Sequence, residues 1–152
     1  MSDLGDLYQQ TILDHNRNPR NFRRLEHANR TAEGNNPLCG DRIQLYVQVE
    51  GEAITDIAFQ MPPGAGCAIS KASASLMTDA VKGKPVAAAE AMFQAFRDML
   101  AGGATAPGKL AAFSGVRAFP SRIKCANLAW HALHAALQNS SQPVTTESAR
   151  DY

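Results

Sequence analysis

The chain has 152 residues, 45% of them hydrophobic and 19% charged, and its 15 basic and 14 acidic side chains give a formal net charge of +1. This balance argues against a broad basic surface for nucleic acid. No run reaches the ~18–20 apolar residues of a membrane helix, so we expect no membrane partner either. The length predicts a single domain over residues 1–138, followed by a flexible polar tail over residues 139–152. The opening residues have neither a basic leader nor an apolar stretch, so we expect no signal peptide and a cytoplasmic protein.

The first predicted element is a helix over about residues 4–14, which ends at the breaker Asn16-Arg17-Asn18-Pro19. The next segment, residues 15–30, is polar and basic. It is either a solvated connector or a docking surface for an acidic partner. Residues 33–37, Glu-Gly-Asn-Asn-Pro, have the composition of a turn.

Two strands and a loop follow. Between Arg42 and Glu50 apolar and polar residues alternate, which predicts a half-buried strand. The Glu50-Gly51-Glu52 turn leads into a second strand over residues 53–60. A hairpin with one polar face indicates a small antiparallel sheet that is packed against helices. The loop over residues 61–66, Met-Pro-Pro-Gly-Ala-Gly, then ends the sheet.

Helical periodicity predicts the remaining elements, which are helices over residues 67–82, 86–100 and about 121–138. A glycine-rich break separates the last two. Phe96 and Trp130 lie on apolar stripes and are expected in the core, whereas His131 and His134 are expected at the surface or rim. The order helix, strands, helices predicts an α+β fold.

The three cysteines, Cys39, Cys67 and Cys125, are odd in number and sit in a chain long enough for an ordinary core, so a disulfide framework is excluded. Each lies at the edge of a predicted element. Cys67 opens a helix, and Cys125 lies in the first turns of another, next to Lys124 and after Arg122. Helix N-termini and neighbouring cations lower a thiol pKa, and the thiolate is the form that binds metal. Asp41 lies two residues after Cys39, so its carboxylate can point the same way.

Three sulfurs and one carboxylate make four ligands, which suits either a tetrahedral zinc site or an iron-sulfur site. The long gaps between the cysteines and the absence of a Cys-x-x-Cys pair favour unrelated buried or free cysteines over a shared metal site, as far as spacing alone is concerned. Other chemistries have less support. Gly64-Ala65-Gly66 lacks the remaining glycines of a dinucleotide loop and the Lys-Ser/Thr of a phosphate loop. A nucleophilic Cys39 of the protease kind would need a histidine base, and nothing local supplies one.

The segments around the cysteines resemble a known family. Residues 35–43 (NNPLCGDRI), 66–75 (GCAISKASAS) and 115–126 (which include FPSRIKCA) are similar to the three cysteine motifs of iron-sulfur assembly scaffolds related to IscU and the N-terminal part of NifU. Residues 8–21 are similar to the opening helix of that family and its exit. Lys124 stands where IscU proteins usually carry histidine, and the region around residues 100–114 corresponds to an insertion, so the chain resembles the SufU branch. Met61-Pro62-Pro63 lengthens one loop relative to both.

The resemblance implies a fold, a site and a function. Cys39, Asp41, Cys67 and Cys125 would bind one zinc ion, and Cys39 would accept persulfide sulfur from a SufS-type cysteine desulfurase and carry it to downstream iron-sulfur assembly proteins. Lys124 and Arg122 would be nearby cations that offset the charge of three thiolates. The protein would then act as a sulfurtransferase. The alternative is a scaffold on which an iron-sulfur cluster is assembled and then transferred, with iron or the cluster in place of zinc.

Overall fold

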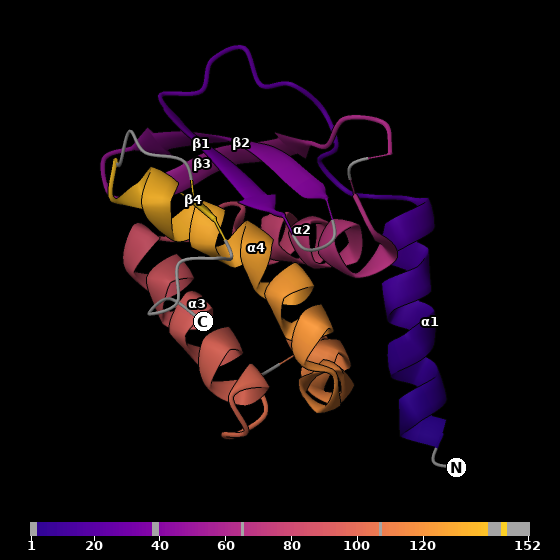
Figure 1. Cartoon of the computed structure of the whole chain (residues 1–152). Helices are drawn as coiled ribbons and strands as arrows, with labels where there is room; N and C mark the ends of the chain where they lie inside the picture. The colour runs from indigo at the N-terminus through magenta and orange to yellow at the C-terminus, as the bar shows by residue number, and fades with distance from the viewer. Residues whose placement is uncertain (1–2, 38–39, 65, 107, 140–143, 146–152) are drawn as a thin grey trace.

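The sheet and its helices form two layers in the computed structural model, which describes residues 3–37, 40–64, 66–106, 108–139 and 144–145. Figure 1 shows the helices on one face of the sheet and the ribbon between the first helix and the first strand on its far side. The elements in chain order are α1 (Asp3–Arg17), β1 (Arg30–Asn36), β2 (Asp41–Glu50), β3 (Ala53–Gln60), α2 (Ala68–Val81), α3 (Val86–Leu100), the 3₁₀ helix η1 (Gly108–Ala118), α4 (Pro120–Leu137) and β4 (Val144–Thr145).

The sheet has the strand order β3-β2-β1-β4. Both long pairings are antiparallel, as the alternating pattern predicts, whereas β4 lies parallel to β1 over two residues. The alternation of β2 turns four apolar side chains toward the helices, and they are almost completely buried: Ile43, Leu45, Val47 and Val49. The α+β class and the sheet packed against helices are therefore confirmed. β4 lies within the expected tail, and the rest of that tail, residues 140–143 and 146–152, is outside the described residues.

Helix α4 occupies the middle of the helical layer, where it contacts β1, β2, α2, α3 and η1. Trp130 on α4 is fully buried and its ring stacks on Phe96 of α3 at a centroid distance of 5.0 Å. The expected core positions of these two residues are confirmed. Because neighbours surround α4 on several sides, His131 is also buried, with 6% of its surface exposed. The expectation of a rim position for His131 was wrong, while the side chain of His134 is 44% exposed.

Two further segments differ from the sequence prediction. Residues 30–36, expected to contain only a connector and a turn, form strand β1, because their backbone pairs with β2 along its whole length. His15, expected in a polar connector, lies on α1 and is 1% exposed. Its Nδ1 atom lies 2.7 Å from the hydroxyl oxygen of Ser75 on α2, so it joins the two helices.

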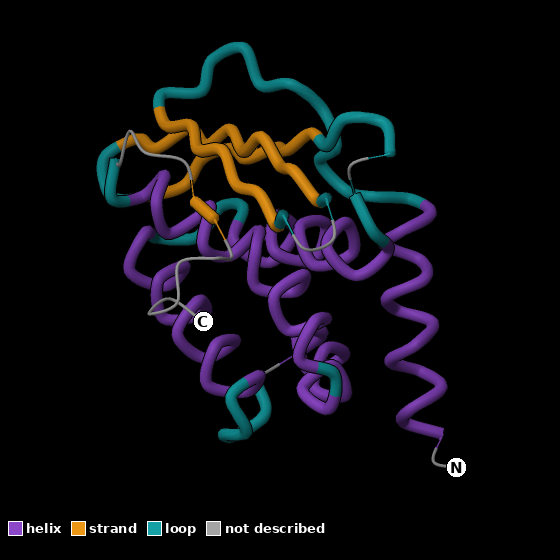
Figure 2. The backbone as a smooth tube through the Cα atoms, in the orientation of Figure 1, coloured by secondary structure: helices purple, strands orange, loops and turns teal. Residues whose placement is uncertain are grey.

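The connector between α1 and β1 follows the outer edge of β3. The backbone N–H of Phe59 donates to the carbonyl of Asn21, and the N–H of Arg23 donates to the carbonyl of Phe59, both at 3.0 Å. Figure 2 shows this segment as the long loop that borders the sheet. The pairing fixes Phe22 near the start of α2, where the residue is 38% exposed. Among the described residues, none of the helices combines the length and apolar character that crossing a bilayer requires.

Candidate metal centre

Asp41 stands at the first position of β2 and faces the helical layer, with 1% of its surface exposed. The sheet register places it opposite Asn36, the last residue of β1. Its Oδ1 atom accepts a hydrogen bond of 2.9 Å from the backbone N–H of Cys67. One carboxylate oxygen is thus committed to the start of α2, and Oδ2 faces the sulfur atoms.

Cys67 is the N-cap residue of α2, with an extended backbone and a half-buried side chain. The N–H of Ser70 donates to Cys67 Sγ at 3.4 Å, and the Ser70 hydroxyl oxygen lies 3.5 Å from the same atom. The sulfur therefore takes the place that a serine or aspartate oxygen usually has at a helix N-terminus. On its other side, Cys67 Sγ lies 3.6 Å from Asp41 Oδ2.

Cys125 lies in the second turn of α4 and is 3% exposed. Its sulfur, the sulfur of Cys67 and a carboxylate oxygen of Asp41 all lie within 4.8 Å of one another. In a tetrahedral zinc site with bonds of about 2.3 Å to sulfur, neighbouring sulfurs are ~3.8 Å apart. Two thiols and one carboxylate also match the donor types that zinc uses. The residues present therefore fit a divalent metal ion, and they come from three elements that are far apart in sequence.

The thiol of Cys67 is set up to ionise. A hydrogen bond from the Cys125 side chain is the largest cause that lowers the pKa of Cys67, from 9.0 to about 6, and both hydrogen bonds from Ser70 act in the same direction. Burial and the negative charge of Asp41 raise the pKa and oppose them. The lowered pKa favours the thiolate of Cys67, which is the form that binds metal.

Asn36 belongs to this site although the sequence reasoning treated it only as part of a turn. It is fully buried, and its Nδ2 atom donates to Asp41 Oδ2 and to Cys125 Sγ, each at 3.4 Å. A signal was present, since an asparagine next to a proline in the first cysteine motif is a polar residue beside candidate ligands. Its burial depends on strand β1, which the turn composition of residues 33–37 concealed.

The other predicted site residues are placed as follows. Cys39 lies outside the described residues, between Pro37 and Gly40, which are both exposed. The N–H of Gly40 donates to the carbonyl of Asn36 at 2.8 Å, and Gly40 adopts a φ of 75°, so the loop that contains Cys39 begins and ends close to Asp41. Lys124 is half-buried next to Cys125. Arg122 is exposed, and its guanidinium lies 4.7 Å from the ring centroid of Phe119.

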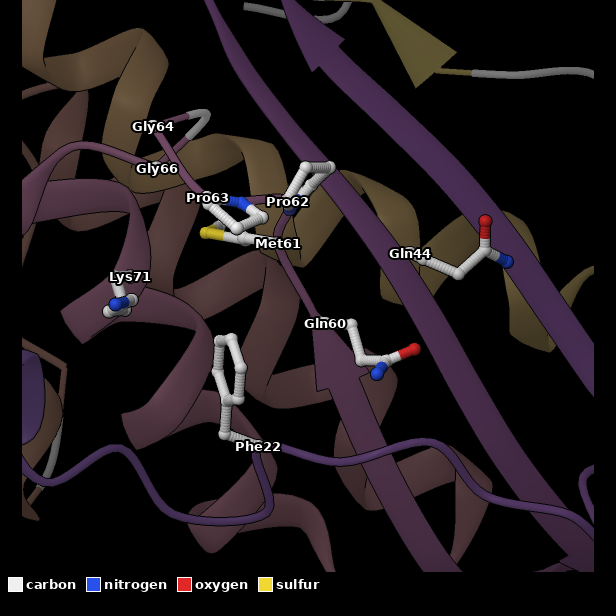
Figure 3. A pocket seen from close by; sticks show the side chains of 9 residues that line it. All are labelled: Phe22, Gln44, Gln60, Met61, Pro62, Pro63, Gly64, Gly66 and Lys71. Atoms are coloured by element: carbon white, nitrogen blue, oxygen red, sulfur yellow. The ribbon is translucent and has the colours of Figure 1, made fainter.

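A surface groove of about 570 Å³ opens beside the start of α2. Figure 3 shows the Phe22 ring directed toward Met61 and Pro63, with the Lys71 ammonium beside it and two glutamines on the strands opposite. Gly66, the residue before Cys67, forms part of the wall. A Cβ atom at this position would lie 2.6 Å from the Met61 sulfur, so a larger residue here would require the Met61 side chain to move. The Met61-Pro62-Pro63 loop therefore shapes the groove next to Cys67.

The arrangement of the site agrees with comparisons to known proteins. Residues 7–146 match the family described as NifU-like N terminal domain. The chain belongs to this family. It is 44% identical to the zinc-dependent sulfurtransferase SufU of Bacillus subtilis, over 87% of this chain and 90% of that protein. It is also 38% identical to the iron-sulfur cluster assembly scaffold protein IscU of Streptococcus pyogenes, over 99% of this chain and 96% of that protein.

Solved structures support the same family. A crystal structure described as an iron-sulfur cluster assembly scaffold for the SUF system of Fervidobacterium islandicum superimposes with a TM-score of 0.79 at 32% identity. The superposition covers 84% of this chain and 94% of that one. The resemblance in the cysteine motifs, including its SufU character, is thus confirmed at the level of the family and of the fold.

Proposed function

We propose that this protein takes part in iron-sulfur cluster assembly as a zinc-dependent acceptor and carrier of persulfide sulfur from a SufS-type cysteine desulfurase. The observation that carries the proposal is the convergence of Asp41, Cys67 and Cys125 within 4.8 Å. The similarity to a zinc-dependent sulfurtransferase over 90% of its length supports zinc as the ion. Cys39 would complete the ligand set, because its loop is closed beside Asp41 by the hydrogen bond from Gly40 to Asn36.

A bound zinc ion has no redox chemistry of its own and would keep the thiols deprotonated without oxidising them. The residues of the chain have distinct tasks around it. Ser70 and the Cys67 backbone hold one sulfur and one carboxylate oxygen in place. Lys124, which is half-buried beside Cys125, and the more exposed Arg122 would offset the charge of several thiolates.

The transfer step would take place at the sulfur of Cys39. Its thiolate attacks the outer sulfur of the desulfurase cysteine persulfide, a new sulfur–sulfur bond forms on Cys39, and the desulfurase cysteine leaves as a thiolate. Electrons balance without an added oxidant or reductant, as in other thiol exchange reactions. Pro37 and Gly40, the nearest described residues before and after Cys39, are exposed, which supports access of the partner. The carried sulfur would then pass to downstream iron-sulfur assembly proteins. We place this activity in the cytoplasm and assign it to a single domain over residues 1–138.

The test is sulfur transfer from the desulfurase to the wild-type chain and to Cys39→Ser, followed by mass spectrometry of the cysteine peptides. We expect one added sulfur on the Cys39 peptide of the wild type and none on the variant, with desulfurase turnover no longer stimulated. Ser73→Ala, which alters a buried hydroxyl that bonds the carbonyl of Ala126, serves as a folding control. Undiminished turnover with Cys39→Ser, or added sulfur on Cys67 alone, would eliminate Cys39 as the acceptor.

A scaffold function is the second candidate, and it is favoured by the 38% identity to an IscU scaffold over 99% of this chain. On that reading the same residues would bind an iron-sulfur cluster as cargo. Anaerobic reconstitution with iron and sulfide, followed by mixing with an apo-ferredoxin, separates the two functions. A cluster that forms and moves to the ferredoxin favours the scaffold, whereas tight zinc with strong stimulation of the desulfurase favours the sulfurtransferase.

A further inference from the structure

Asn36 is the buried polar side chain that bridges two of the proposed metal ligands. An amide nitrogen carries two hydrogens, and Nδ2 of Asn36 lies 3.4 Å from Asp41 Oδ2 and 3.4 Å from Cys125 Sγ. Each acceptor can therefore receive one N–H. Asn36 is fully buried, so water cannot replace the amide at either acceptor.

Backbone contacts fix the position of Asn36 at the end of the sheet. Asn36 is paired with Asp41 at the end of the β1–β2 ladder, and its carbonyl accepts the N–H of Gly40 at 2.8 Å. The side chain thus starts from a fixed point on the sheet and reaches a sulfur on α4. This contact links the sheet to the helix across the site, 89 residues apart in sequence.

We propose that Asn36 is a positioning residue of the metal centre, which sets Asp41 Oδ2 and Cys125 Sγ in place and moderates the strength with which that sulfur binds the ion. The inference rests on the proposed function, because it assumes that these atoms are ligands. An N–H donated to a thiolate stabilises the sulfur lone pairs and makes the thiolate a weaker donor. Partners that orient metal ligands in this way typically contribute 10–100-fold to metal affinity.

Asn36→Leu removes both donors and keeps the number and branching of the side-chain heavy atoms. Loss of the fixed ligand positions should outweigh the stronger donation by the freed Cys125 sulfur. We therefore expect zinc affinity, measured by competition with a chelator, to fall by about 10–100-fold. In the cobalt-loaded protein, the thiolate-to-cobalt charge-transfer band should move to lower energy, since the sulfur loses its hydrogen bond. A purely structural role of Asn36 would lower the melting temperature of the loaded protein without moving this band.

Asn35→Leu is the matched control. Asn35 is the same residue type one position earlier, and its Oδ1 accepts the hydroxyl of Thr145 on β4 at 3.3 Å, away from the site. This variant should leave the cobalt band where it is in the wild type.

A second measurement needs no variant. In the cadmium-loaded wild type, a side-chain amide proton of Asn36 should show scalar coupling to cadmium through the sulfur of Cys125.

The outcomes separate the two levels of the proposal. An unshifted band with unchanged zinc affinity in Asn36→Leu overturns the positioning role alone and leaves the metal centre intact. If that variant does not fold, absence of the cadmium coupling in the wild type overturns it equally. A wild-type chain that takes up neither zinc nor cobalt overturns the proposed function, and the role of Asn36 with it.

Discussion

Replacing Asp41 by asparagine should lower both the pKa of Cys67 and the affinity of the centre for zinc. The change keeps the size of the side chain and an oxygen that can accept the N–H of Cys67, but it removes one negative charge. That charge raises the pKa of Cys67 in the wild type, which is about 6. Its removal should therefore lower the pKa of Cys67 further. Zinc should nevertheless bind more weakly, because a neutral amide oxygen is a poorer ligand than a carboxylate.

The size of the pKa change follows from the distance of 3.6 Å between Cys67 Sγ and Asp41 Oδ2. At that distance two unit charges repel by about 1 kcal/mol at the dielectric constant of water and by about 4–5 kcal/mol at an effective value of ~20. One pKa unit corresponds to about 1.4 kcal/mol, so the fall lies between about one and three units. Because Cys67 is half-buried, we expect a fall of about one unit, near the lower bound.

The assay is the pH dependence of iodoacetamide alkylation of the metal-free protein, followed by mass spectrometry of the Cys67 peptide. Chelator competition on the zinc-loaded protein gives the second readout. Asp79→Asn, which removes an exposed carboxylate from the same helix, is the control and should change neither property. A pKa of Cys67 that stays constant or rises in Asp41→Asn would refute the electrostatic account of the site.

Two further predictions concern stability. Trp130→Ala should lower the free energy of unfolding by about 3–5 kcal/mol, because the side chain is fully buried against Phe96. Urea denaturation measures this change, and a loss below ~1 kcal/mol would contradict the packing of α4. Burial is the largest cause that lowers the pKa of His15 from its ordinary value of 6.5. The unfolded chain therefore binds the proton first, and the wild type should lose stability as the pH falls below about 6.5. His15→Asn, which can keep a hydrogen bond to Ser75, should show a shallower loss, and parallel curves of unfolding free energy against pH would contradict this.

The elements that were predictable from sequence are those with a strong periodic pattern. The alternation of β2 and the apolar stripes of α2, α3 and α4 show which face of each element is buried. This information lies in the order of neighbouring residues. Strand β1 was not predictable in the same way. Gly34, Asn35 and Asn36 have turn propensities, and the segment becomes a strand because β2 offers its edge for pairing. The missed strand also concealed Asn36 as a site residue.

The remaining differences come from contacts between distant residues. His15 is buried at the α1–α2 contact, where its Nδ1 lies 2.7 Å from the hydroxyl oxygen of Ser75, 60 residues away. His131 is buried because α4 is enclosed by its neighbours. The 3₁₀ helix η1 had a readable signal. Leu110, Phe113 and Val116 recur every three residues, which is the period of a 3₁₀ helix, and all three are buried. The convergence of Cys67 and Cys125 with Asp41 was accessible only through the family motifs, since the spacing of the cysteines contains no ligand pair.

X-ray absorption at the zinc edge, combined with native mass spectrometry of the protein as purified, tests the central claim most directly. We predict one zinc ion per chain with three sulfur neighbours and one oxygen neighbour, and the loss of one sulfur neighbour in Cys67→Ser. A chain that carries no metal under anaerobic conditions, or an ion whose neighbours do not change in Cys67→Ser, would contradict the assignment of Asp41, Cys67 and Cys125 to a metal centre.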